Sequence, residues 1–257
     1  MSFPTNPGFF DYPTEVALGR STTRKVIHKF GQNQAVGNTV EDVWITGGIY
    51  VWLTAAVTME AISDDTNDDS DGTGARTIRL EGLDANWDEI SETITMNGTS
   101  VTVATTQLFI RLNRAYVVTC GTYSSSNIGN ITIRTSGAGA THAMIDVENS
   151  LGTGQTQLAR YSVPRNNIIV IYSIHIWSDQ TQPATIFLFK RENGDTVTAP
   201  FSARRLMFEV AGLTVPENII IKTPIKLPSH TDVYFQVIAG AGSTDVAVDF
   251  EFIQVTG

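Results

Sequence analysis

Cysteine, long apolar runs and charged side chains are all scarce in this sequence of 257 residues. With Cys120 as its single cysteine, the chain can form neither an internal disulfide nor a zinc site built from several cysteines. No apolar run reaches the roughly 18 residues that a membrane-spanning helix needs. Residues 1–5 lack the basic-then-apolar order of a signal peptide. We therefore expect neither a disulfide-stabilised secreted scaffold nor a membrane-bound protein.

The charge balance argues against nucleic acid as a partner. Charged residues make up 17% of the chain, against about 25% in ordinary domains, and the net charge is −9. Affinity for nucleic acid depends on Lys and Arg side chains that displace counterions, and here acids outnumber bases. Residues 41–92 carry thirteen acids and two arginines, a net charge of −11, whereas residues 93–257 are balanced. We expect one exposed acidic region on a near-neutral protein.

The acidic run 64–71 partly matches a calcium-binding loop of the EF-hand type. Gly72 matches the glycine of the sharp bend, but the twelfth position, which must be Glu, is Ile78. Neither flank has a helical pattern, so a solvated acidic loop without metal explains the residues better. The weak calcium candidates, at the first, third and fifth positions, are Asn67, Asp69 and Asp71.

Residues able to do chemistry are few and scattered. No two histidines have metal-ligand spacing on one predicted element, and Cys120 ends an apolar strand, where a small buried side chain is the better interpretation. Neighbouring carboxylates such as Asp88 with Glu89, or Asp146 with Glu148, are ordinary at strand edges and only nominally resemble a glycosidase pair. We predict no catalytic residue, no cofactor and no enzymatic activity. The histidines are His28, His142, His175 and His230.

Alternation of polar and apolar residues at period two runs through most of the chain and predicts β-strands. Strands that alternate in this way bury one face, as antiparallel sheets do. Asn97-Gly98, between two such segments, predicts a two-residue hairpin. About fourteen strands favour an all-β fold of two antiparallel, jelly-roll-like β-sandwich units, and one large jelly roll with long insertions is the alternative. The alternation is clear at 77–81, 92–96, 130–134 and 246–252.

Glycine and proline divide the chain into four parts. Residues 1–30 form an expected N-terminal arm, 31–138 a first β-sandwich domain, 139–154 a glycine-rich linker and 155–257 a second β-sandwich domain. The arm interleaves prolines with aromatic residues, which prevents a regular element. Such an arm either crosses a neighbouring subunit or lies along its own domain.

Four tryptophans offer a sugar-stacking platform as a further possibility. Trp52 and Trp177 lie within apolar strands and are interpreted as core residues. Trp87 is the only one in a polar setting. The composition of these segments favours core or subunit contacts over sugar binding.

Several segments resemble virion structural proteins of tailed bacteriophages, especially those that infect aquatic bacteria and cyanobacteria. None of these segments contains a catalytic or ligand-binding motif, so the resemblance indicates a particle component without an activity. It extends over most of residues 26–255. The segments that carry it are 81–98, 109–116, 121–123, 155–164, 187–191 and 200–201.

The resemblance implies a capsid decoration (cement) protein, homotrimeric, that binds the major capsid protein on the exterior of the virion. Such a protein would be made in the host cytoplasm and would need neither nucleic acid nor membrane as a partner. A tail, neck or fibre-associated structural protein is the alternative, and a glycan-binding module of the virion is a further one. The expected assembly contacts lie in the arm: Phe3, Phe9, Phe10, Tyr12, Arg20, Arg24 and Lys25.

Overall fold

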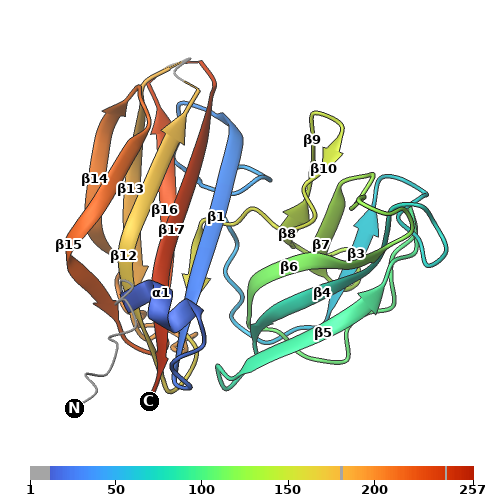
Figure 1. Ribbon diagram of the computed structural model, residues 1–257, viewed down its shortest axis with the longest axis horizontal. Helices are drawn as coiled ribbons and strands as arrows, with labels where there is room; N and C mark the ends of the chain where they lie inside the picture. The colour runs from blue at the N-terminus through green and yellow to red at the C-terminus, as the bar shows by residue number, and fades with distance from the viewer. Residues whose placement is uncertain (1–11, 180–181, 241) are drawn as a thin grey trace, which may run out of the picture.

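The computed structural model describes residues 12–179, 182–240 and 242–257. These residues form an all-β fold of several antiparallel sheets with one short helix, which confirms the all-β, antiparallel character expected from the alternation (Figure 1). The helix is α1 (Tyr12–Ala17); the strands are β1 (Arg24–Val36), β2 (Glu41–Asp42), β3 (Met59–Ser63), β4 (Ala75–Leu83), β5 (Glu89–Thr95), β6 (Arg111–Cys120), β7 (Ile131–Thr135), β8 (Thr141–Ile145), β9 (Val147–Glu148), β10 (Leu151–Gly152), β11 (Arg160–Ser162), β12 (Asn167–Ser178), β13 (Ala184–Arg191), β14 (Arg205–Leu213), β15 (Glu217–Leu227), β16 (Asp232–Ala239) and β17 (Thr244–Thr256).

Two sheets that share one core form what we call the larger unit, made of β1, β2 and β11–β17. One sheet has the strand order β1-β17-β12-β15, and the other has the order β11-β16-β13-β14, with β2 also paired to β16. Every second side chain of a strand points into the space between the sheets. Ile169 and Ile171 of β12, Phe250 and Phe252 of β17 and Phe235 of β16 are fully buried there.

The smaller unit consists of β3–β10 and has a core of its own. Its sheets have the strand orders β3-β7-β8 and β5-β4-β6, and β9 pairs with β10. Ile78 and Leu80 of β4 meet Ile131 and Ile133 of β7 in this core, and none of the four is exposed. The alternation seen at 77–81 and 130–134 therefore corresponds to an inside and an outside face.

The first strand of the chain belongs with the last. β1 pairs with β17 along most of its length, from Arg24↔Val255 to Gln32↔Ala247. The smaller unit is thus inserted between β2 and β11 of the larger unit, and the two lie side by side in Figure 1. This pairing moves the end of the expected arm, because 24–30 is strand, and it corrects the boundary that we expected at residue 31.

The glycine-rich stretch 139–154 contains β8, β9 and β10, so it is not a linker. Gly137, with φ of 79°, lies in a tight turn between β7 and β8, and the N–H of Gly139 donates to the carbonyl of Thr135 (2.9 Å). The strands on either side then pair through Ile131↔Ile145. Glycine serves here to reverse the chain within the smaller unit.

Helix α1 lies against β1 at the edge of the larger unit (Figure 1). Pro13 suits the first turn of a helix because that turn has no use for its N–H, and Glu15 suits the positive end of the helix dipole. Val16 is 4% exposed and anchors the helix to the unit. No helix among the described residues is long and apolar enough to cross a membrane.

Candidate functional site at the junction of the two units

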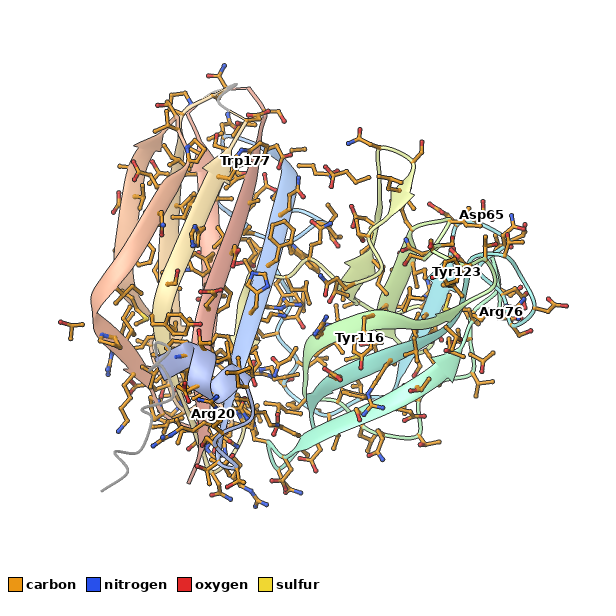
Figure 2. All side chains as sticks on the ribbon, in the orientation of Figure 1. Arg20, Asp65, Arg76, Tyr116, Tyr123 and Trp177 are labelled. Carbon is orange, nitrogen blue, oxygen red and sulfur yellow. The ribbon has the colours of Figure 1, made fainter. Side chains whose placement is uncertain are left out.

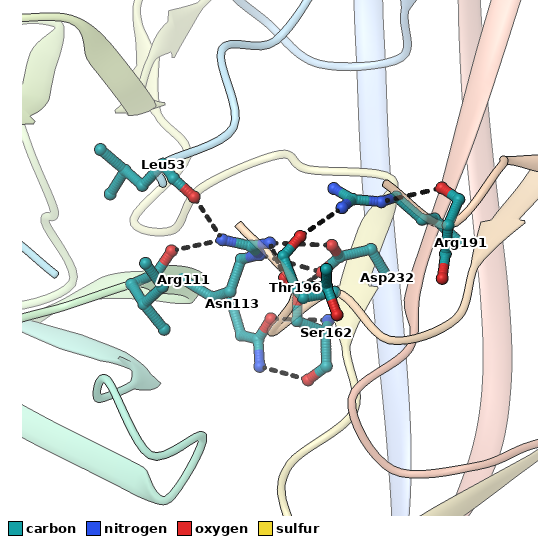
Figure 3. Close-up of polar contacts among 10 residues, drawn as sticks. Leu53, Arg111, Asn113, Ser162, Arg191, Thr196 and Asp232 are labelled. Carbon is teal, nitrogen blue, oxygen red and sulfur yellow. Dashed lines mark hydrogen bonds and ion pairs between the residues drawn. The ribbon is translucent and has the colours of Figure 1, made fainter. Parts of the chain in front are cut away.

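A buried ion pair joins the two units. Arg111 of β6 donates from Nε and Nη2 to the two carboxylate oxygens of Asp232 of β16, each at 3.0 Å (Figure 3). Both side chains are 2% exposed. The remaining donors of the guanidinium bond the carbonyls of Leu53 and Ile110 (2.9 Å each) and of Gly194 (3.2 Å). The pairing is bidentate, the geometry that gives arginine–carboxylate pairs their strength.

Two more contacts extend this network across the junction. The hydroxyl of Ser162 on β11 donates to Asp232 (2.5 Å). Asn113, two residues after Arg111, accepts from the N–H of Ser162 (2.9 Å) and donates to its carbonyl (3.0 Å) (Figure 3). The side chain of Asn113 thus mimics a strand neighbour for β11. The result is a continuous set of hydrogen bonds between β6 of the smaller unit and β11 and β16 of the larger one.

Two aromatic rings lie against the guanidinium of Arg111. The ring of Trp52 lies 5.1 Å from its central carbon and the ring of Trp87 lies 5.0 Å from it. Trp87 is 1% exposed, so the tryptophan that we expected in a polar setting is part of the junction. Cation–π contacts strengthen when water is excluded, as it is here.

A second buried arginine, Arg160 of β11, lies in an aromatic cage beside the junction. Its guanidinium carbon is 3.0 Å from the ring centroid of Tyr50 and 5.4 Å from that of Trp44, and Nη2 donates to the carbonyl of His142 (2.6 Å). Burial lowers the pKa of Arg160 to about 10. Burial, followed by the charge of Arg160, lowers the pKa of His142 to about 4, so this histidine is neutral at pH 7.

An open cleft of about 570 Å³ lies between β1 and the sheet of β4, β5 and β6. Six consecutive residues of β1, 25–30, line one wall, and Glu81, Glu89 and Arg114 line the other. Lys29 is 5% exposed, and its Nζ donates to the carbonyl of Asn113 (2.5 Å). The pKa of Lys29 falls to about 7, first because burial disfavours the ammonium and then because Arg160 and Arg114 repel it.

The acidic run 64–71 is organised around Asp68, which is fully buried. Its carboxylate accepts from the backbone N–H of Ala75 (2.8 Å), Ile128 and Gly129 (2.9 Å each) and from the hydroxyl of Ser63 (2.7 Å). One carboxylate thus holds three chain segments at the end of the smaller unit. Asp65, Arg76 and Tyr123 mark this end, which points away from the larger unit in Figure 2.

The three calcium candidates contact different partners and share none. Asn67 donates to the carboxylate of Asp65 (2.8 and 2.9 Å), and Asp69 accepts from Ser70 (2.5 and 2.9 Å). Asp71 is exposed, and its backbone carbonyl accepts from Arg76 (3.1 Å). Among the described residues, no group of three histidine, cysteine or carboxylate side chains is placed to hold a metal ion.

Several acidic side chains of residues 41–92 pair with other groups of the same chain. Glu60 pairs with Arg134 (2.8 Å), and the N–H of Gly137 lowers its pKa. Glu41 accepts from the N–H groups of Gly37 and Gly48. Asp88 pairs with Arg165 of the larger unit (2.7 Å). Fewer carboxylates of this segment are therefore unpaired at the surface than its net charge of −11 suggests.

The expected assembly contacts fall into two groups. Phe3, Phe9 and Phe10 lie outside the described residues, as does the side chain of Tyr12. Arg20 pairs with Glu15 of α1 (2.5 Å), Arg24 lies in β1 opposite Val255, and Lys25 approaches Glu89 of the smaller unit (3.6 Å).

The junction and the cleft were missing from the expectations because their residues are distant in the sequence. One signal existed for Lys29: in the alternation of β1 it occupies an inward position, between Ile27 and Gly31. A lysine at an inward position of a strand must reach a partner or the edge of the core. Neither Arg111 nor Asp232 carried a comparable signal.

Comparisons with known proteins give only distant likenesses. No family model matches the sequence, and no curated protein matches it. Solved structures of infectious bursal disease virus are similar at low level: the Gx strain (9% identity, TM-score 0.28) and the Gt strain (10% identity, TM-score 0.27). Each match covers 91% of this chain and 73% of the other. A third, the VP2 subviral particle of that virus, has 10% identity and a TM-score of 0.23.

Proposed function

We propose that this chain is a non-enzymatic structural protein of a virus particle, and more specifically a capsid decoration protein. The observation that carries the proposal is the winding of the larger unit. Its eight principal strands divide between the sheets as β1, β12, β15 and β17 against β11, β13, β14 and β16. This is the winding of a jelly roll, an architecture used by viral capsid proteins and lectins.

The buried contacts of the junction support the same role. A subunit that stabilises a shell must transmit force between its own parts without bending. The Arg111–Asp232 pair and the Asn113–Ser162 contacts join the two units through buried groups, which exchange poorly with water. Two units that moved freely would instead meet through a small polar interface.

In this proposal the protein forms a homotrimer on the capsid exterior and binds the major capsid protein. An interface of about 1,600 Å² supports affinities from micromolar to picomolar, and many symmetric copies add avidity. The N-terminal residues 1–11 supply a contact to the lattice. Because Val16 of α1 is buried, a truncation that tests this contact has to end before Tyr12.

The copy number of this chain in purified particles tests the decoration role. We expect hundreds of copies, and the density of the chain on the outer capsid surface in images of intact particles. A copy number near a dozen or below, with density in the tail or neck, would instead establish the alternative of a tail, neck or fibre-associated protein. Deletion of residues 2–11 is expected to abolish capsid loading and to leave the thermal unfolding of the protein unchanged.

One observation favours a glycan-binding role as the second candidate. Trp177, which is labelled in Figure 2 and which we expected in a core, is 42% exposed. It lines a hollow of about 330 Å³ on the four-stranded sheet. His175, Asp249 and Glu217 line the same hollow, so polar groups stand beside an aromatic face, as sugar recognition needs. A glycan array tests it: binding that Trp177→Ala removes would support this role, and silence across the array would reject it.

A further inference from the structure

The cleft beside β1 borders a strand edge that is still available for pairing. β1 bonds β17 on one side only. The N–H of Thr256 bonds the carbonyl of Thr23 (2.8 Å), and bonded pairs recur at every second residue of an antiparallel ladder. Ile27 and Lys29 therefore bond β17, whereas the backbone groups of Val26, His28 and Phe30 point away from it. Within the described ranges, no backbone hydrogen bond uses these outward groups.

The space beside this edge has the size of a binding site. At about 570 Å³, the cleft lies within the range of roughly 300–1,000 Å³ that is usual for ligand clefts. Residues 25–30 form one wall and the sheet of β4, β5 and β6 the other, and Ile27, Ile90 and Tyr161 add apolar surface. An unpaired strand edge beside a walled cleft is the setting in which a partner strand adds to a sheet.

When Lys29 is protonated, below its pKa of about 7, the cleft has an excess of positive charge. Lys25, Lys29 and Arg114 face Glu81 and Glu89. Glu89 lies 3.6 Å from Lys25, whereas Lys29 has a neutral partner, the carbonyl of Asn113. A buried ammonium without a carboxylate partner is costly, and an incoming carboxylate lowers that cost.

We propose that this cleft binds an extended segment of a partner protein that carries an acidic side chain, by strand addition to the outer edge of β1. The backbone groups of Val26, His28 and Phe30 pair with the segment, and its carboxylate pairs with Lys29. The inference goes beyond the proposed function, since it holds whether or not the chain belongs to a virus particle.

The ammonium of Lys29 gives this binding a pH dependence. Lys29 faces Arg160 of β11, Arg114 of β6 and Glu81 of β4, and the cleft also contains Lys25, His28, Glu89 and Tyr161. Because the pKa of Lys29 is about 7 in the unbound protein, a carboxylate binds the protonated form below that pH and meets a neutral amine above it. Linkage of this kind weakens binding about tenfold between pH 6 and pH 8.

The probe is the peptide acetyl-Thr-Val-Glu-Val-Thr-Val-amide, which has no group that titrates between pH 6 and pH 8. Titration calorimetry with the full chain is expected to show binding at pH 6 that is about tenfold weaker at pH 8. The same peptide with Lys in place of Glu should bind at least tenfold more weakly. Hydrogen exchange at the amides of Val26, His28 and Phe30 should slow when the peptide is present.

Variants separate the strand edge from the side chains. His28→Pro removes an N–H that points away from β17, so the sheet is expected to persist while peptide binding is lost. His28→Ala, the matched control, keeps that N–H and should still bind. Lys29→Met should bind without the change between pH 6 and pH 8.

Three outcomes would overturn the inference. One is binding to His28→Pro as tight as to His28→Ala; another is unchanged hydrogen exchange at the three amides at saturating peptide. The third is binding that appears only after residues 2–11 are deleted, since that result would make the N-terminal segment of this chain the occupant.

Discussion

Arg111 and Asp232 lie 121 positions apart in the sequence and meet through two hydrogen bonds of 3.0 Å each. Their contact joins a strand of the inserted unit to a strand of the unit that surrounds it. Both groups are out of reach of water, so each depends on the other for its charge to be compensated.

Replacing one partner of this pair should therefore destabilise the protein strongly. We expect Arg111→Met to lower the free energy of unfolding by about 3–5 kcal/mol, since it leaves the carboxylate of Asp232 buried and unpaired. The double variant Arg111→Met with Asp232→Leu should recover part of that loss. Denaturant unfolding at pH 7 measures both.

The exposed pair Arg165–Asp88 provides the control, because it also crosses between the units. Its side chains are 47% and 42% exposed, so Arg165→Met should cost about 0–1 kcal/mol. Equal losses of unfolding free energy for Arg111→Met and Arg165→Met would contradict the prediction that the buried pair stabilises the protein more than the exposed pair does.

Asp68 should be the one acid of the loop 64–71 whose loss matters for stability. Asp68→Ala removes the acceptor of four hydrogen bonds and leaves the buried N–H groups of Ala75 and Gly129 unpaired, each at a cost of about 1–3 kcal/mol. Asp71→Ala, in the same loop but exposed, should change stability by less than about 0.5 kcal/mol. Thermal unfolding of the two variants measures this difference. Equal losses of stability would mean that Asp68 contributes no more than an exposed acid of the same loop.

Because of Lys29, the free energy of unfolding should rise as the pH rises above neutrality. Its pKa is about 7 in the folded chain and 10.5 as the ordinary value, so between these limits the unfolded state binds more protons. The free energy of unfolding then rises with pH, with a slope approaching about 1.4 kcal/mol per unit. Below pH 7 both states carry the proton and this contribution is flat.

Lys29→Met isolates that effect, because it fills a similar volume without a charge. Subtracting its unfolding free energies from those of the wild type between pH 6 and pH 10 should leave the slope that Lys29 supplies. A difference that does not vary with pH would mean that Lys29 keeps its ordinary pKa in the folded protein.

Gly31 lets β1 pass close to β11, and a methyl group there should be costly. A Cβ on Gly31 would lie 2.0 Å from the backbone nitrogen of Ala159, the residue before β11. Backbone hydrogen bonds to Val43 and Phe235 hold Ala159 in place. We expect Gly31→Ala to destabilise by about 1–3 kcal/mol. Gly240→Ala, where the nearest atom is 3.5 Å away, should be near neutral in the same thermal unfolding measurement.

Local patterns predicted the strands well and their pairing poorly. The two-residue hairpin predicted at Asn97-Gly98 does not form, and β5 pairs with β4. The N–H of Ser100 bonds the carbonyl of Asn97 (3.0 Å), so the turn is centred on Gly98, with φ of 57°, and Thr99. Instead the N–H groups of Thr102 and Thr105 bond the carbonyls of Ala61 and Met59 of β3. Alternation tells which face of a segment is buried, but it does not tell which distant segment covers that face.

The same limit explains the missed site. We expected residues 24–30 in an arm without a regular element, but they belong to β1, whose partner β17 begins more than 200 residues later. The arm and the first domain were therefore divided at the wrong place. Arg111, Asp232 and Lys29 gain their roles only from this long-range arrangement. The tryptophans show the same limit. Trp87, in a polar stretch of sequence, is buried in the junction, whereas Trp177, in an apolar stretch, is exposed on a sheet.

The position of β17 between β1 and β12 has a consequence for biosynthesis. All strands of the inserted unit have been made at residue 152 and its core is filled at Leu158, so the unit can fold while translation continues. The four-stranded sheet lacks β17, one of its two inner strands, until this thirteen-residue strand is made. A ribosome-stalled chain that ends before Thr244 should thus carry a folded insert within a surrounding unit that is still open, and that unit should close only once β17 has been made.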